Sequence, residues 1–532
     1  MNKKFTALAA LSMAGALVLA GCSNAADSGN AGNSAEGGGT NYIIGYGSEP
    51  ESPLLPGDTN ETGGGRILTM IGSSLFYYDA DGVTHPDLAE SVTSDDSQVY
   101  TVVLKKGQKF SDGTEVKAEN FTKAWNYAVK ESLKQASFFS SIKGFEEGKE
   151  MEGLEVVDDY TFKVTLAQPE ADWPLRLGYS AYQPMADSAF TDIKAYGENP
   201  PASGPYKVSK WNHNEDILLV PNETYTGPRK PMNDGVKLKF YPELPAAYTD
   251  LIADNLDVLD AIPDIALTTF KTELGDRAVN KPSALFYSFT IDTDEKHFAG
   301  EEGKLRRQAI SMAINRPEIT EKIFNNVKSP AKDFTAPVLQ GYSDSIKGSE
   351  VLAYNPDKAK ELWAQANAIS PWEGQFKLAY NSDGGHQSWV DAVANSIKNT
   401  LEIDAVGEAY PDFKSLRTKV SKHEMETAYR TGWLADYPSQ YNFLAPIYAT
   451  GGSSNDGNYS NPEFDKLLKE GLAAKNVEDA LAKFTQAQEI LMQDLPAIPL
   501  WYSNSTGGYS TKVQNVTVGW DSNPLYYQIT KK

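Results

Sequence analysis

Strand-like and helix-like segments alternate along this chain without a uniform βαβ rhythm. Residues 42–47, 100–104 and 158–166 show the short β-branched or alternating runs that are typical of strands, and residues 305–314 repeat apolar side chains at helical spacing. We expect the 100–104 and 158–166 strands to pair with each other. The pattern predicts a mixed α/β protein with several lobes, and 532 residues are enough for more than one domain.

Three asparagines, each followed by a proline one or two residues later, predict where helices begin. An Asn side chain can cap the first turn of a helix, and proline is tolerated in that turn because its missing N–H would have no helical partner. We expect helices to begin after Asn315, Asn355 and Asn461. The glycine run Gly63–Gly65 indicates a hinge instead.

The charge, the cysteine content and the glycine spacing exclude several classes of protein. The formal net charge of −22 argues against nucleic-acid binding, which needs a basic surface. The single cysteine, Cys22, allows neither an intrachain disulfide nor a cysteine-rich metal site, and the five histidines show no pair at metal-ligand spacing. Gly45-x-Gly47 is followed by Pro50 where a dinucleotide loop needs a third glycine. We therefore expect no metal and no cofactor.

The first 41 residues have the composition of an export signal followed by a tether. Residues 1–21 combine two early lysines with a short apolar run, and Leu19-Ala-Gly-Cys22 resembles a bacterial lipobox, in which the cysteine is acylated. Residues 22–41 are rich in Gly, Ser, Ala and Asn and predict a flexible tether. We expect an extracytoplasmic protein that is lipid-anchored through Cys22 to the outer face of the bacterial cell membrane.

The segment Tyr429–Pro438 contains the clearest candidate for ligand binding. It holds Arg430, Trp433 and Asp436, and its aromatic residues and glycine argue against a helix. If the segment is extended, Arg430 and Asp436 point to the same side, roughly 20 Å apart at 3.3 Å per residue. A cation and an anion on one face suit a ligand with opposite charges at its ends, such as a peptide. The alternative is a solvated strand end whose charges pair elsewhere.

Eight landmarks along the chain, together with the lipobox, resemble the peptide/nickel-type extracellular solute-binding proteins of ABC importers, known as family 5. They occur in the same order and cover nearly the whole chain after Cys22. The landmarks are Pro86–Ser91, Asp95-Asp96, Tyr100–Leu104, Gly107–Gly113, Ser203–Tyr206, Leu305–Arg316, Tyr459–Asp465 and Leu495–Leu500.

The resemblance implies a periplasmic-binding-protein-like fold of type II, with two lobes, an extra domain and a two-segment hinge. By analogy, residues 42–76, 200–283 and 500–532 form lobe I, residues 77–199 form the extra domain, and residues 284–499 form lobe II. The ligand would bind between the lobes and stabilise a closed form that the membrane permease recognises. The resemblance also implies a monomer that is not an enzyme.

The resemblance assigns roles to the residues of the candidate segment. Asp436 matches the family position that receives the α-ammonium of a peptide, and Arg430 matches one that meets the peptide carboxylate. Trp433 becomes a pocket wall, and Gly432 and Ala435 join the predicted binding set, although Gly432 can also break the straight spacing.

Three further positions modify this assignment. His386 resembles a family histidine near the C-terminal end of the peptide, although by itself it has the sequence context of a surface loop. Asp292 stands before Thr293 where the family has Asn, which puts peptide contacts from that strand in doubt. Val92 replaces a Trp of the signature region, which indicates a packing change.

Two other functions are open from the sequence. The importer role is compatible with a sugar, a metal chelate or another small solute as the cargo, but the joint presence of Arg430 and Asp436 favours peptides. A surface-anchored hydrolase could use paired acidic residues, but no nucleophile elbow or metal motif supports it.

Overall fold

The computed structural model describes residues 41–532 apart from residues 51–52, 383–384, 412 and 453. The predicted signal (1–21), Cys22 and all but the last residue of the predicted tether (22–41) therefore lie outside the described residues. The described part is a mixed α/β protein, as predicted.

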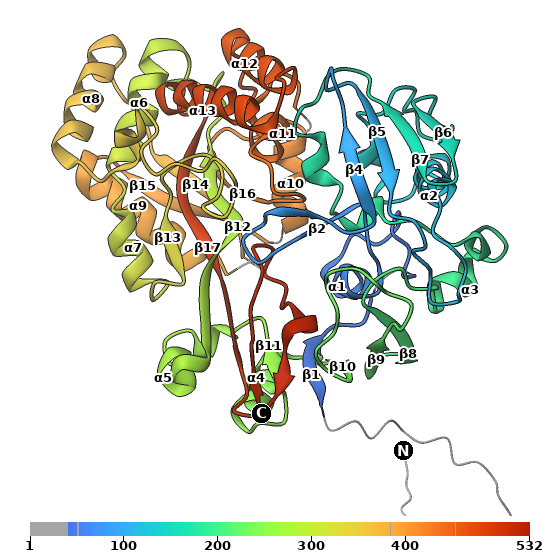
Figure 1. Cartoon of the computed structure of the whole chain (residues 1–532). Coiled ribbons are helices and arrows are strands. Elements are labelled where there is room, and N and C mark those ends of the chain that lie inside the picture. Colours follow the sequence, from blue (N-terminus) through green and yellow to red (C-terminus); the bar gives the residue numbers. More distant parts are fainter. Residues whose placement is uncertain (1–40, 51–52, 383–384, 412, 453) are drawn as a thin grey trace, which may run out of the picture. The chain divides into compact units, whose positions relative to one another are not determined.

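A long mixed sheet runs through the described part of the chain (Figure 1). Short β13 (Lys328–Pro330) pairs with β17 beside the main path. The strands on the path follow the order β15 (Ala405–Tyr410), β14 (Phe376–Asn381), β16 (Ala428–Leu434), β12 (Ala278–Thr290), β17 (Ala497–Tyr509), β11 (Val258–Leu259), β1 (Tyr42–Gly47), β10 (Gly235–Phe240), β9 (Asp216–Pro221) and β8 (Tyr206–Asn212).

The long strands β12 and β17 connect two hydrophobic cores. They pair antiparallel from Ala278–Gly508 to Thr290–Ala497, with a register shift between Pro282 and Leu285. At one end β17 pairs with β11, in the part of the sheet that carries the core around Ile43 and Val236. At the other end, both strands contribute to the largest core, which also includes α9, α12 and α13. Two paired strands thus link the two regions.

A separate antiparallel sheet forms between residues 89 and 165. Its strands follow the order β4 (Ala89–Thr93), β5 (Val99–Leu104), β7 (Thr161–Thr165) and β6 (Leu154–Asp158). The predicted pairing of the 100–104 and 158–166 segments is confirmed by the β5–β7 register. Tyr100 and Val102 on β5 and Phe162 and Val164 on β7 point to one buried face, because side chains alternate along a strand. Helix α2 packs on that face with Trp125.

Most helices lie beside the strands of the largest core, where α8 and α9 are adjacent (Figure 1). The helices are α1 (Thr62–Ile71), α2 (Ala118–Lys130), α3 (Ile193–Glu198), α4 (Leu244–Ile252), α5 (Phe270–Leu274), α6 (Gly300–Met312), α7 (Arg316–Lys322), α8 (Pro356–Ile369), α9 (Gln387–Leu401), α10 (Phe413–Ser421), α11 (Tyr441–Tyr448), α12 (Pro462–Leu472) and α13 (Val477–Asp494). The remaining short strands are β2 (Phe76–Tyr78), β3 (Thr84–Pro86), β18 (Val513–Gln514) and β19 (Thr530–Lys531).

The three predicted asparagine caps are confirmed. Asn315, Asn355 and Asn461 precede α7, α8 and α12, and their side-chain oxygens accept backbone N–H groups of the first turn at 3.0–3.3 Å. Each helix has its proline at one of the first two positions. Local side-chain chemistry therefore fixes these helix starts.

The predicted hinge at Gly63–Gly65 is wrong, because these glycines lie in the first turn of α1. Both carboxylate oxygens of Glu61 accept the Gly64 N–H, at 2.9 and 3.0 Å. A Cβ on Gly63 would lie 2.6 Å from Oγ of Ser48. The glycines thus allow the start of the helix to pack closely against its cap.

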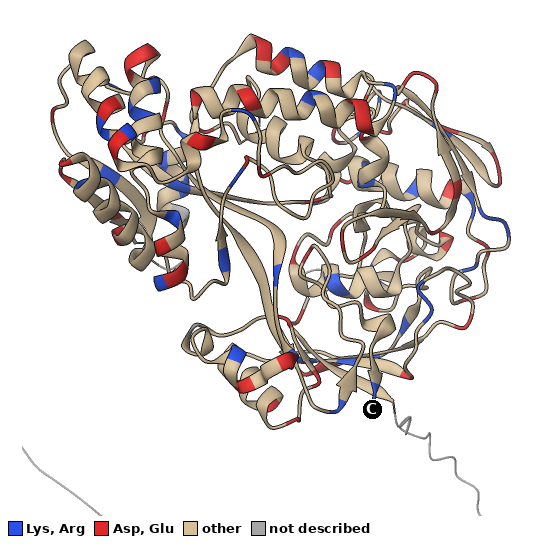
Figure 2. Cartoon of the chain, turned by 60° about the vertical axis from the view of Figure 1, so that its left-hand side comes forward, with Lys and Arg blue, Asp and Glu red and all other residues tan. Residues whose placement is uncertain are grey.

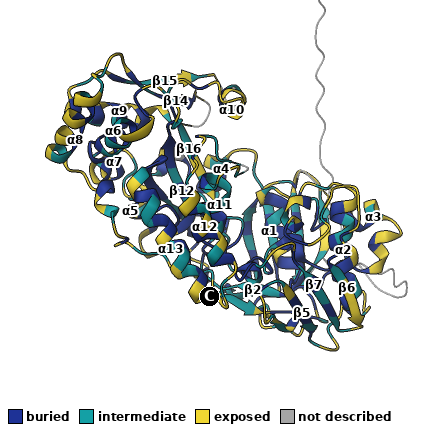
Figure 3. Ribbon diagram, turned by 90° about the horizontal axis from the view of Figure 1, so that it is seen from above, coloured by how far each residue is buried: buried dark blue, intermediate teal, exposed yellow. Residues whose placement is uncertain are grey.

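Buried residues concentrate along the strands and the inner faces of the helices, as the view in Figure 3 shows. Acidic and basic residues occur together on the outer helices in Figure 2.

Candidate functional site

A cavity of about 250 Å³ lies beyond the end of β16 and is lined by segments that are far apart in the sequence. The segment that follows β16 contributes one wall, and the start of α1, the turn at 178–180 and the C-terminal region contribute the others. The lining includes Glu61, Arg66, Tyr179, Ala435, Asp436, Trp520 and Asp521. Aromatic rings and carboxylates thus surround one space.

Asp436 brings a half-buried carboxylate to this cavity. Its Oδ2 accepts a hydrogen bond from Nδ2 of Asn442 at 2.9 Å, and its backbone N–H donates to Oδ1 of the same asparagine at 3.0 Å. Burial raises the pKa of the Asp436 carboxyl above its ordinary value, and the hydrogen bond from Asn442 opposes that rise. A partly desolvated carboxylate of this kind favours a cationic partner.

The opposite walls of the cavity add charged and aromatic groups. Burial raises the pKa of Asp521, whose carboxylate accepts from the side chain of Asn523 at 2.8 Å. Arg66 forms a buried ion pair with Asp260, so its charge is already compensated. Apart from Arg66, the charged side chains that line this cavity are all acidic, namely Glu61, Asp436 and Asp521.

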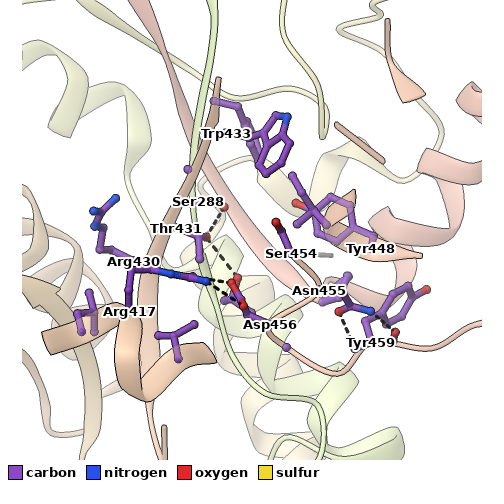
Figure 4. Close-up of a pocket in the computed structure, with 18 residues that line it drawn as sticks. Ser288, Arg417, Arg430, Thr431, Trp433, Tyr448, Ser454, Asn455, Asp456 and Tyr459 are labelled. Carbon is purple, nitrogen blue, oxygen red and sulfur yellow. Dashed lines mark hydrogen bonds and ion pairs between the residues drawn. The ribbon is translucent and has the colours of Figure 1, made fainter. Parts of the chain in front are cut away.

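A second cavity, of about 210 Å³, lies along β16 (Figure 4). Ser288 on β12 and Thr431 on β16 are register partners, and their hydroxyl oxygens are 2.7 Å apart. Across the cavity, Nη1 of Arg417 lies 2.7 Å from Oδ2 of Asp456. Arg430, Gly432 and Trp433 also line this space, together with the loop 454–457.

Arg430 lies on β16 among polar and aromatic neighbours. Its Nε donates to Oδ1 of Asn381 at 2.8 Å. Burial raises the pKa of the Tyr287 hydroxyl, and the Arg430 charge opposes that rise, which indicates that the two groups are near each other. Nζ of Lys328 lies 4.0 Å from the centre of the Tyr287 ring, so a second cation is present in this region.

The structure divides the predicted site residues between the two cavities. Arg430, Gly432 and Trp433 line the one along β16, whereas Ala435 and Asp436 line the other. The extended conformation is confirmed for the first three, but β16 ends at Leu434, before Asp436. The expectation of two charges on one straight face is therefore wrong, because the strand ends between them and the two residues line different cavities. Gly432 does not cause this break, since it pairs regularly with Tyr287.

His386 lies apart from the residues that line either cavity. It directly precedes α9, and its Nδ1 accepts a hydrogen bond from Nε1 of Trp389 at 3.1 Å. Part of the preceding loop, residues 383–384, is outside the described residues. The structure thus gives His386 a contact with its own helix.

Several lining residues were missed by sequence reasoning. Glu61, Tyr179, Trp520 and Asp521 come from regions with no shared motif, so no spacing could bring them together. Asn442, which bonds to Asp436 without lining either cavity, had one weak signal, because it is a polar residue in the otherwise apolar or aromatic stretch at 441–448.

The described residues contain neither a metal-binding cluster nor a membrane-spanning helix. No cluster of His, Cys, Asp and Glu side chains in that part of the chain could hold a metal ion. No helix there is long and apolar enough to cross a membrane.

Comparisons with known proteins find bacterial binding proteins as the relatives of this chain. Residues 83–455, more than half of the chain, match the family described as bacterial extracellular solute-binding proteins, family 5 Middle. The oligopeptide-binding protein OppA of Bacillus subtilis is 25% identical over 493 residues, covering 88% of each chain. The heme-binding protein A of Haemophilus influenzae is 26% identical over 468 residues, covering 83% of this chain and 82% of its own.

A solved structure extends the comparison to the fold. The unliganded open form of the periplasmic murein tripeptide-binding protein MppA matches with a TM-score of 0.82 and 21% identity, covering 92% of this chain and 97% of that one. At this identity the match establishes the fold, which is the predicted arrangement of two lobes and an extra domain.

Proposed function

This chain belongs to the family 5 bacterial extracellular solute-binding proteins, and from that premise we propose that it captures short peptides for an ABC importer. Peptide binds between the two lobes, closure about β12 and β17 encloses it, and the closed form delivers it to the membrane permease. The chain acts as a binding protein and catalyses no reaction.

The half-buried carboxylate of Asp436 carries this proposal. It lines a cavity whose other walls come from residues 59–69, 178–180 and 520–523, so a ligand there would touch segments of all three proposed regions. Because burial penalises an unpaired carboxylate, the site gains most from a ligand with an ammonium group. The α-ammonium of a peptide supplies that charge next to an extended backbone.

The strand next to Asp436 offers a partner for that backbone. On one side, β16 pairs with β12 as far as Leu434. On the other side, its pairing with β14 reaches only from Ala428 to Tyr429. The side of β16 that faces β14 therefore has an edge at residues 431–434, beyond the residues that pair with β14. A peptide can add there as a further strand, and backbone hydrogen bonds of this kind are independent of the peptide sequence.

Arg430 lies at the other end of this edge and meets the peptide carboxylate. Its planar guanidinium can donate two parallel hydrogen bonds to a carboxylate. Gly432 and Trp433 lie between the two charged ends, and Ala435 adjoins Asp436. His386 acts only for a ligand that is long enough to reach the start of α9.

A different cargo is the second candidate. One relative is named for heme binding, so membership of the family does not by itself determine the cargo. A sugar or a metal chelate does not require an anion and a cation at opposite ends of one strand edge, where Asp436 and Arg430 lie. That pairing of charges favours peptides, and the hydrolase remains a distant alternative with no catalytic group to support it.

The location follows from the N-terminal sequence. We propose that residues 1–21 are removed, that Cys22 is lipid-modified, and that residues 22–41 tether a monomeric binding protein to the outer face of the bacterial cell membrane. The predicted lobe boundaries, at 76/77, 199/200, 283/284 and 499/500, form part of the same proposal.

Calorimetric titration with a matched pair of ligands tests the proposed function. A set of peptides of three to five residues is compared with the same peptides acetylated at the N-terminus. We expect the free peptides to bind at least about tenfold more tightly, because a buried charge pair contributes a few kcal/mol. Equal binding of both forms would show that no carboxylate receives the ammonium, and binding of neither form would reject peptides as the cargo.

A further inference from the structure

Asn442, in the first turn of α11, connects two of the predicted binding residues. Its Nδ2 donates to Oδ2 of Asp436 at 2.9 Å. Its Oδ1 accepts from the backbone N–H of Asp436 at 3.0 Å and from Nε1 of Trp433 at 3.2 Å. One side-chain amide thus makes three hydrogen bonds to the segment that follows β16.

The chemistry of an amide allows only one orientation at this position. The nitrogen end is a donor and faces a carboxylate, and the oxygen end is an acceptor and faces two N–H groups. Asn442 is only 4% exposed, so water does not substitute for these bonds. The rotamer of the Asp436 side chain and the plane of the Trp433 indole are therefore fixed by the same group.

The helix that carries Asn442 is itself anchored. Oγ of Ser439 donates to Oδ2 of Asp172 at 2.6 Å and accepts from the backbone N–H of Tyr441 at 3.1 Å. Asp172 and Ser439 are both 1% exposed. A contact with the segment at 170–176 thus holds the first turn of α11 in place, and Asn442 acts from a fixed position.

The remaining oxygen of Asp436 is left for the ligand. Oδ2 is occupied by Asn442, and within the described residues Oδ1 has no hydrogen-bond donor. Asp436 lines the 250 Å³ cavity, so an ammonium in that cavity can approach Oδ1. The hydrogen bond to Oδ2 favours the ionised carboxylate, which is the form that binds a cation.

We propose that Asn442 is the positioning residue of the ammonium receptor. It keeps Asp436 ionised and turned toward the cavity, and it orients Trp433 beside it. The inference rests on the proposed function, because it takes Asp436 to be the group that receives the peptide α-ammonium.

Two variants separate positioning from a merely structural role. Asn442→Ala removes all three hydrogen bonds. Asn442→Asp retains the size of the side chain and the acceptor for the N–H groups, but it replaces the donor with a second carboxylate. Both changes raise the pKa of Asp436, since the first removes a donor and the second adds a like charge.

The readout is the pH dependence of peptide affinity. Binding of a free N-terminus requires ionised Asp436, so affinity is lost as the pH falls through its pKa. A higher pKa moves this loss to higher pH. We expect the midpoint of the acid limb to rise by about one unit in Asn442→Ala and further in Asn442→Asp, with affinity for the free peptide at least about tenfold weaker below the new midpoint. Affinity for the N-acetylated peptide should stay unchanged.

Asn461 provides a matched control. Its Nδ2 donates to Oδ2 of Asp494, also at 2.9 Å, and its Oδ1 accepts two backbone N–H groups, but neither residue lines the two cavities. Asn461→Ala should leave the pH midpoint and the ratio of the two affinities at the wild-type values.

The outcomes distinguish the inference from its premise. If the wild-type protein binds free and acetylated peptides equally, Asp436 is not the receptor, and the proposed function and the inference both fail. If wild type discriminates but Asn442→Asp keeps the same midpoint and the same ratio, the inference alone is overturned. If Asn442→Ala does not fold, the isosteric Asn442→Asp variant still decides between these results.

Discussion

Arg430 and Asp436 come from one short segment but line two different cavities. Arg430 lies within β16, where its Nε donates to Asn381, and it lines the cavity along that strand. Asp436 follows the end of the strand and lines the cavity bounded by Glu61 and Trp520. The two charges stand at opposite ends of the edge at residues 431–434, so the recognition of each end of a peptide can be tested separately.

Removal of the Asp436 charge should weaken binding of peptides with a free N-terminus. In Asp436→Asn the amide retains the size of the side chain but cannot balance an ammonium. We expect a loss of about tenfold or more for the free peptide and little change for its N-acetyl form, measured by calorimetry. The exposed Asp344→Asn makes the same change in net charge away from both cavities and should bind like wild type. An equal loss for both peptides would mean that Asp436 has only a structural role.

Removal of the Arg430 charge should affect the other end of the peptide. Arg430→Gln is expected to weaken binding of peptide acids by about tenfold, because a paired carboxylate in a closed cleft loses its partner. Peptides with a C-terminal amide should lose much less. Arg430→Lys keeps the charge but not the planar fork, so its affinity for peptide acids should lie between those of wild type and Arg430→Gln. If Arg430→Gln lowers the affinities for peptide acids and for peptide amides by the same factor, the peptide carboxylate is bound elsewhere.

The buried carboxyl of Asp333 should make stability depend on pH. Burial raises its pKa to about 6 from an ordinary 3.8, although the hydroxyl of Tyr502 lies 2.9 Å from its Oδ1. The folded state therefore binds more protons than the unfolded chain between these pH values, so the free energy of unfolding falls as the pH rises through them. The total change is about 3 kcal/mol, at roughly 1.4 kcal/mol per pKa unit.

Asp333→Asn isolates this effect because its side chain stays neutral. Loss of hydrogen-bond geometry shifts its stability by an amount that does not depend on pH. Relative to wild type, the variant should gain about 3 kcal/mol between about pH 3 and pH 7, measured by urea unfolding at several pH values. Parallel stability curves for the two proteins would contradict the buried titration.

Lipid attachment at Cys22 can be tested in cells. Cys22→Ser removes the thiol that carries the acyl chains, so we expect the protein to move from the membrane fraction to the soluble extracytoplasmic fraction. Ser23→Ala, one residue on, should leave it in the membrane fraction. Retention of Cys22→Ser with the membranes, assayed by fractionation and immunoblotting, would refute the anchor.

Local signals were enough to predict much of the fold. The helix starts at Asn315, Asn355 and Asn461 depend on one side chain and its own first turn, and the β5–β7 pair follows from alternation within two short runs. The glycine run at 63–65 gave the wrong result because its role depends on Ser48 and Glu61, which pack against it. A hinge and a closely packed helix start have the same local composition.

The site was only partly predictable for a related reason. Asp436, Trp433 and Arg430 lie in one segment, so a motif could identify them together. The opposing walls at Glu61 and Asp521 come from the two ends of the chain, and only the fold brings them to the same cavity. The position of Asp436 beyond the end of β16 depends on a hydrogen bond with Asn442, which strand periodicity does not contain.

Native mass spectrometry of the protein, purified without denaturant from cells that express it, tests the central claim most directly. We expect added masses that correspond to short peptides with free N-termini, that are released on unfolding and that are reduced in Asp436→Asn. Recovery of an oligosaccharide, a metal chelate or heme in place of peptides would contradict the claim that this protein carries peptides.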